Sequence, residues 1–187
     1  MRKILTKSQQ KSKERFNQIL VGLVLIFIMI LSVLGYGLVG RDSSKEEKII
    51  FNGIEFKKIN NLWEIEQENF KFVFKYNPKE IERVNSQVDY FDSYYNKPLY
   101  ISSENLEATE EIYQNMYSFV ERMQKACLNE EECEGDLPIK NCENNFIIIR
   151  ESNNSRITQN QNCVFIEGNQ ENLVKLTDDF LFKILGI

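Results

Sequence analysis

One uncharged stretch constrains this chain more than any other feature of its sequence. Residues 19–39 are twenty-one consecutive residues without a charge, and most of them are Ile, Leu, Val, Phe or Met. About 20 apolar residues, each rising 1.5 Å along a helix, cover the roughly 30 Å hydrocarbon core of a bilayer. The stretch therefore predicts a single transmembrane helix over residues 18–39.

The charges on either side of this stretch predict its orientation. The N-terminal flank carries one acid, Glu14, against six basic residues: Arg2, Lys3, Lys7, Lys11, Lys13 and Arg15. On the other side Arg41 is followed at once by Asp42, and Lys45 by two glutamates. Flanks rich in Lys and Arg stay in the cytoplasm. We expect a single-pass plasma-membrane protein with residues 1–17 cytoplasmic, a linker over 40–47 and residues 48–187 extracytoplasmic.

The apolar stretch could also be a cleaved signal peptide or a pilin-type leader in place of an uncleaved anchor. A cleaved signal peptide has an apolar region of about 7–15 residues and a small-x-small cleavage site. The run here is longer, and the candidate sites are Gly35-Tyr36-Gly37 and the residues before Gly40. A pilin-type leader usually has a Gly before its cut, but no Gly precedes Gly22. Length favours the anchor, while the sequence leaves cleavage open.

The extracytoplasmic part is acidic. The chain has 23 Lys and Arg against 28 Asp and Glu, and residues 1–40 hold six of the former and one of the latter, so residues 41–187 have a net charge of −10. A domain with this charge is not attracted to phosphate backbones. We therefore expect the membrane as a partner and no nucleic acid.

All four cysteines lie on the predicted outer side, at Cys127, Cys133, Cys142 and Cys163. An even number of cysteines outside the cytosol predicts two disulfides. The gaps are wider than the close pairs of structural zinc sites, and no C-x-x-C redox motif is present. Sequence alone allows three pairings.

Residues 48–187 predict a small α+β domain with a short sheet, a long amphipathic helix and a C-terminal helix. The first strands are expected over Ile49–Ile59, which is a strand or hairpin arm, then Leu62–Glu66 and Phe70–Tyr76, with a turn at Asn60-Asn61. In the last strand four aromatic side chains share one face: Phe70, Phe72, Phe74 and Tyr76. This row favours a core face over a ligand platform.

Helical signals follow this row. Asn77-Pro78 and Glu80 form a capping pattern that predicts a short helix ending near Val84 or Val88. Further on, a brief strand is expected over Leu99–Ser102, an amphipathic helix over Asn105–Ala126, and a last helix over Gln170–Leu185, capped by Asn169 and stopped by Gly186.

Three short segments predict a strand meander: Phe146–Arg150, Arg156–Gln159 and Cys163–Glu167. Its first and third strands run in the same direction, which places Cys142 and Cys163 at the same end of the sheet. The meander therefore favours a Cys142–Cys163 disulfide, with Cys127–Cys133 closing the acidic loop beside it.

No catalytic, metal or cofactor site is predicted. The chain has no histidine, the commonest general base and zinc ligand. Carboxylate or lysine chemistry would have to use residues such as Glu130, Glu131, Asp136 or Lys140, which are candidates only because they lie close together in the sequence. The acidic loop lacks the alternating ligand pattern of a calcium loop. Asn153-Asn154-Ser155 is a possible glycosylation site at Asn153.

Three segments together resemble a group of short, membrane-anchored archaeal proteins of unknown function. They are the aromatic strand running into Tyr76–Glu80, the run Cys133–Cys142, and Asn162–Ile166 followed by the terminal helix Asp179–Ile187. The resemblance implies an extracytoplasmic, disulfide-bearing domain and carries over no catalytic residue.

An anchor followed by a small domain without a catalytic motif predicts a cell-surface binding or assembly module with an unidentified protein partner. The alternative is an accessory subunit of a membrane secretion, envelope or transport complex. An enzyme is the least favoured class, because the chain offers neither a histidine nor a catalytic constellation.

Overall fold

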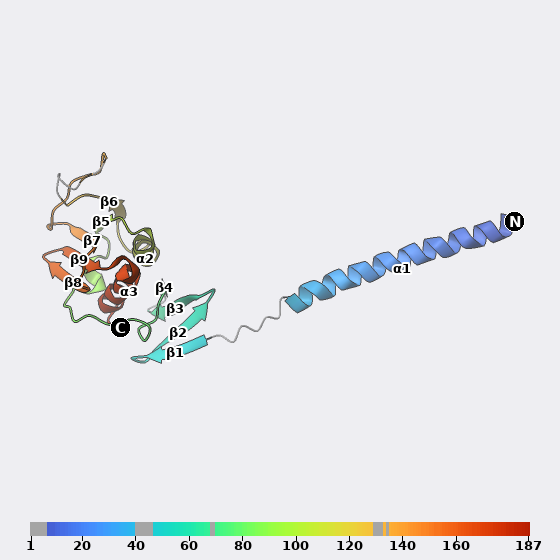
Figure 1. Cartoon of the computed structure of the whole chain (residues 1–187), viewed down its shortest axis with the longest axis horizontal. Helices are drawn as coiled ribbons and strands as arrows, with labels where there is room; N and C mark the ends of the chain where they lie inside the picture. The colour runs from blue at the N-terminus through green and yellow to red at the C-terminus, as the bar shows by residue number, and fades with distance from the viewer. Residues whose placement is uncertain (1–6, 40–46, 68–69, 129–132, 134) are drawn as a thin grey trace. The chain divides into compact units, whose positions relative to one another are not determined.

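A computed structural model describes residues 7–39, 47–67, 70–128, 133 and 135–187 (Figure 1). The chain divides into two compact units, Met1–Lys45 and Glu46–Ile187. In the first unit, helix α1 (Lys7–Val39) contains the apolar stretch Phe16–Val33. This stretch has a mean hydropathy of 2.5, and none of it is buried. This helix is long and apolar enough to cross a membrane. Of the predicted linker, residues 40–46 lie outside the described residues.

The second unit is a mixed α+β fold, as the sequence predicts, but it has two sheets in place of one. The first sheet is an antiparallel meander in the order β1 (Glu47–Phe51), β2 (Ile54–Ile59), β3 (Leu62–Gln67) and β4 (Phe70–Phe74). Two tight turns of this sheet lie within the described residues, Asn52-Gly53 and Asn60-Asn61, and all four of these residues have positive φ. Asn and Gly tolerate this conformation, which the favoured two-residue hairpin turns require.

The second sheet has the order β6-β5-β7-β9-β8. Four strands are parallel, and β8 runs antiparallel to β9 at the edge. The strands are β5 (Pro98–Ser103), β6 (Arg122–Lys125), β7 (Asn145–Glu151), β8 (Arg156–Asn160) and β9 (Cys163–Gly168).

The predicted strand meander is therefore wrong in its order, because the structure places β9 between β7 and β8. The composition of the two strands explains the difference. In β9 the side chains of Val164 and Ile166 are fully buried, whereas β8 is polar except for Ile157. The apolar strand occupies the covered interior of the sheet and the polar strand its edge.

Helix α3 (Leu173–Ile184) packs against both sheets. The ring of Phe182 lies 5.9 Å from that of Phe56 and 4.7 Å from that of Phe74 in the first sheet. The helix also contacts β7, β8 and β9 of the second sheet. Because both sheets cover it, ten of the twelve residues of α3 are buried, and Asp178 and Asp179 are among them.

The predicted long amphipathic helix is wrong in length. Helix α2 covers only Leu106–Met116, and β6 occupies residues 122–125. The backbone N–H groups of Phe119 and Val120 both donate to the carbonyl of Met116, which ends the helix in a turn. Beyond Met116, Phe119 and Val120 are buried in a turn, and Met123 in β6 is partly buried.

The predicted helix after Pro78 is absent, although its capping bonds form. The N–H of Asn77 donates to Glu80 Oε2 (2.9 Å), and the N–H of Lys79 donates to Asn77 Oδ1 (2.8 Å). The indole of Trp63 also donates to Glu80 (2.9 Å), which ties this turn to the first sheet. The chain then runs irregularly as far as the 3-10 turn η1 (Phe91–Ser93).

Candidate functional site

An open cavity of about 480 Å³ lies in the second unit, and we call it the aromatic cavity. Four separate parts of the sequence contribute to it: the β3–β4 hairpin, the segment around η1, the turn after α2 and the end of α3. Its lining consists of Gln67, Phe70, Phe72, Tyr90, Phe91, Asp92, Tyr95, Phe119, Ile184, Leu185 and Gly186. The volume lies within the range of small-molecule sites.

The ring of Phe119 is the centre of the aromatic lining. Its centroid lies 4.7 Å from that of Phe70, 4.8 Å from that of Phe91 and 5.5 Å from that of Phe72. Two of these contacts are edge-to-face and the third is stacked. Such ring pairs add stability beyond their buried area, so the four rings form a fixed wall.

Three aromatic side chains of the lining remain exposed to solvent. Phe70 is 47% exposed, Tyr95 52% and Tyr90 70%. In the row predicted from the sequence, Phe72 and Phe74 belong to the core as expected, whereas Phe70 faces the aromatic cavity. Apolar surface gathered at a cavity is a feature of interaction sites.

Gln67 brings one polar group into the cavity. Its Nε2 donates to the carbonyl of Leu185 at 3.3 Å. Its Oε1 is buried and has no hydrogen-bond partner among the described residues. A buried acceptor without a donor costs about 1–3 kcal/mol, which a water or a ligand donor at this atom would recover.

The segment that carries Tyr90 and Tyr95 to the cavity is held by two adjacent carboxylates of α3. Asp178 Oδ2 accepts the N–H of Tyr76 at 2.9 Å, and Asp179 Oδ2 accepts the N–H of Val84 at 3.0 Å. Both aspartates are fully buried. The bond to Val84 takes the place of a backbone bond of the helix that the sequence predicts here.

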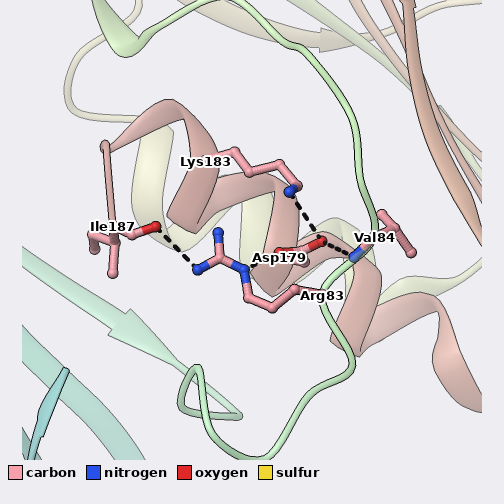
Figure 2. Close-up of polar contacts among 5 residues, drawn as sticks. All are labelled: Arg83, Val84, Asp179, Lys183 and Ile187. Atoms are coloured by element: carbon pink, nitrogen blue, oxygen red, sulfur yellow. Dashed lines mark hydrogen bonds and ion pairs between the residues drawn. The ribbon is translucent and has the colours of Figure 1, made fainter. Parts of the chain in front are cut away.

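The charge of Asp179 is balanced by two cations (Figure 2). Arg83 Nε lies 2.7 Å from Asp179 Oδ1, and Lys183 Nζ lies 3.6 Å from Oδ2. Arg83 Nη1 also donates to the carbonyl of Ile187 at 3.0 Å. The irregular segment and the last turn of the chain are thereby joined through one side chain, beside residues that line the cavity.

Further bonds fix the segment on both sides of η1. Asp89 and Gln159 exchange two hydrogen bonds, of 2.8 and 2.6 Å. Asn145 Nδ2 donates to the carbonyl of Ser93 at 3.1 Å, and the N–H of Asn96 donates to the carbonyl of Phe119 at 2.9 Å. The aromatic cavity is therefore preformed.

Asp178 also faces the carboxyl group of Glu111 on α2. Glu111 Oε2 and Asp178 Oδ1 are buried and find no N–H or O–H donor among the described residues. Burial, and then the charge of Glu111, raises the pKa of Asp178 well above its usual range. Burial also raises the pKa of Glu111. A proton shared between the two groups satisfies both oxygens.

The four cysteines form the disulfides Cys127–Cys133 and Cys142–Cys163. Among the described residues, no group of three or more His, Cys, Asp or Glu side chains could hold a metal ion. Asn153 is exposed in the bend between β7 and β8.

The other candidates from the sequence do not come together as a site. Glu130 and Glu131 lie outside the described residues, and Asp136 is exposed. Lys140 Nζ lies 4.9 Å from the ring centroid of Tyr100, where it makes a cation–π contact. None of these residues lines the aromatic cavity.

Sequence reasoning missed the cavity and most of its residues. The expectation of a core position is correct for Phe72 and Phe119, which line the cavity from the core, and wrong for Phe70. The sequence predicts no role for Tyr90, Phe91, Asp92 and Tyr95. The sequence does contain a signal for the cavity, because the aromatic pairs Tyr90-Phe91 and Tyr94-Tyr95 fall within six residues of a stretch without apolar periodicity. Aromatic side chains in an irregular segment are candidates for a binding surface.

The chain matches no protein-family model, no curated protein and no solved structure. The resemblance to membrane-anchored archaeal proteins therefore stays a prediction.

Proposed function

We propose that this chain is a membrane-anchored, extracytoplasmic binding module whose ligand site is the aromatic cavity. The observation that carries the proposal is a preformed cavity lined by six aromatic side chains, three of which remain exposed. Catalytic residues are not required for such a role, because a module of this kind only has to hold its ligand.

The proposed location combines three observations. The window Phe16–Val33 of α1 is apolar and unburied, so this surface needs lipid to cover it. The basic residues before it favour a cytoplasmic N-terminus. The two disulfides of the second unit are typical of an oxidising, extracytoplasmic compartment.

Cysteine labelling in intact cells tests this topology. The four native cysteines are disulfide-bonded, so an added cysteine supplies the reactive thiol. With a membrane-impermeant maleimide we expect labelling of Thr158→Cys, at an exposed position in β8, and of Ser12→Cys only after lysis. The reverse pattern would overturn the proposed orientation.

Photo-crosslinking tests the binding site. A benzoylphenylalanine replaces Tyr90 at the cavity in the full chain, and Tyr117 in a matched control. Tyr117 is 64% exposed but does not line the cavity. In native cells, irradiation should give one adduct of defined mass from position 90 and none from position 117. Equal adducts from both positions, or none from either, would count against the cavity as the ligand site.

A further inference from the structure

The lining of the aromatic cavity has charge of one sign. Its carboxylate is that of Asp92, and none of its eleven described lining residues is Lys or Arg. The faces of aromatic rings also carry a negative electrostatic potential, because of the ring quadrupole. Residues 41–187 also have a net charge of −10. All three properties favour a cationic ligand and disfavour an anion.

The rest of the cavity narrows the kind of cation. A metal ion such as Ca²⁺ needs six or more oxygen ligands. The side chains here supply the carboxylate of Asp92, the Oε1 of Gln67 and two tyrosine hydroxyls, among mostly apolar neighbours. An alkylated ammonium group suits these surroundings, because its charge interacts with aromatic rings while its methyl groups make apolar contacts.

We propose that the aromatic cavity binds an alkylated ammonium group, through the rings of Tyr90, Tyr95 and Phe119 and the carboxylate of Asp92. The inference rests on the proposed function and specifies its ligand chemistry. A small quaternary amine and a trimethylated lysine side chain both carry this group, and the cavity volume of about 480 Å³ accommodates either.

A pair of isosteric probes isolates the role of the charge. Choline and the neutral 3,3-dimethylbutan-1-ol have nearly the same shape, and only choline is a cation. Saturation-transfer NMR measures their affinities for the full chain in polyoxyethylene detergent micelles. We expect choline to bind at least about five-fold more tightly, given the strength of cation–π contacts.

Other results of this comparison would overturn the inference. Equal or tighter binding of the neutral alcohol would show an apolar site without preference for charge, and would leave the proposed binding function standing. No binding of choline would also exclude an ammonium site. If choline binds as expected, its affinity is then compared with that of acetylated Nε-trimethyllysine amide. Tighter binding of the lysine derivative would indicate a peptide ligand, and tighter binding of choline a small-molecule ligand.

Matched variants tie the affinity to the cavity. Asp92→Asn and Tyr90→Ala should each weaken choline binding about two- to five-fold. Asp136→Asn and Tyr117→Ala, which alter exposed residues outside the cavity, should leave it unchanged. Fluorescence of the buried Trp63 confirms that each variant is folded. Equal losses in a variant and its control, or no loss in either cavity variant, would overturn the assignment.

Discussion

At the scale of single residues, Asp178 and Asp179 show how neighbouring carboxylates can act in opposite ways. Both are fully buried, and both accept a backbone N–H of the irregular segment. Asp179 has two cations beside it, whereas Asp178 faces the carboxyl group of Glu111. Asp179 is therefore held by ion pairs, whereas burial and the neighbouring carboxyl group raise the pKa of Asp178 and favour its protonated form.

The pair of Asp178 and Glu111 makes stability depend on pH. Their folded-state pKa values are raised, so these two groups bind more protons in the folded chain than in the unfolded chain. This contribution to stability is present at acidic pH and is lost as pH rises from about 4 through the folded pKa. Asp178→Asn should remove part of this loss, because its amide can both accept from Tyr76 and donate to Glu111.

We expect Asp178→Asn to raise the free energy of unfolding by about 1–2 kcal/mol at pH 8, and by less at pH 5. Trp63 fluorescence during urea unfolding measures this, because the sole tryptophan is buried in the second unit. Asp179→Asn is the matched contrast and should cost about 2–3 kcal/mol through its lost ion pairs. Two changes of the same sign would contradict this account.

At the scale of elements, Asn115 of α2 completes the outer edge of β4. Its Oδ1 accepts the N–H of Val73 at 2.8 Å, and its Nδ2 donates to the carbonyl of Val73 at 2.7 Å. The amide takes the place of a neighbouring strand for one residue. This pair of bonds joins α2 to the first sheet.

Replacing Asn115 by Ala should cost about 2 kcal/mol, because both backbone groups of Val73 lose their partners. Gln114→Ala, at an exposed position of the same helix, should change stability by no more than about 0.5 kcal/mol. Urea unfolding of the two variants provides the measurement. A similar effect of both substitutions would show that the bonds of Asn115 contribute little.

Elements with strong local signals could be predicted from the sequence. These signals depend only on neighbouring residues. They are the alternation of apolar and polar side chains in β3 and β4, the Asn-rich turn between β2 and β3, and the cap at Asn169. The length of α2 could not be predicted, because Phe119, Val120 and Met123 continue the apolar spacing of a helix, although tertiary packing places them in a turn and a strand.

The aromatic cavity could not be predicted for a different reason. Its lining comes from four segments, and their meeting depends on long-range bonds such as Val84 to Asp179 and Asn96 to Phe119. Local periodicity carries no information on such contacts. It also assigns every regularly spaced aromatic residue to the core, which is correct for Phe72 and wrong for Phe70.

At the scale of the whole molecule, the two disulfides differ in the length of chain that they close. Cys142–Cys163 spans 21 residues and joins the turn before β7 to the start of β9, whereas Cys127–Cys133 spans 6 residues. Longer loops lose more unfolded-state entropy when they are closed. Cys163 is also fully buried, so its bond contributes to packing on the outer face of the second sheet.

Replacing Cys142 and Cys163 together by Ala should lower the free energy of unfolding by about 3 kcal/mol, and replacing Cys127 and Cys133 by about 2 kcal/mol. Trp63 fluorescence in urea again reports the transition. The order of the two losses tests the prediction more directly than their absolute sizes. A larger loss from the shorter loop would show that closure entropy does not control these two bonds.

The edge bonds of Asn115 also bear on how copies of this protein behave when concentrated on a surface. The sequence of β4, Phe-Lys-Phe-Val-Phe, is aromatic and rich in β-formers, which is typical of segments that assemble into amyloid fibrils. An open edge on such a strand recruits identical strands from neighbouring molecules. Because the amide of Asn115 already bonds both backbone groups of Val73, part of that edge is closed to a strand from a neighbouring copy.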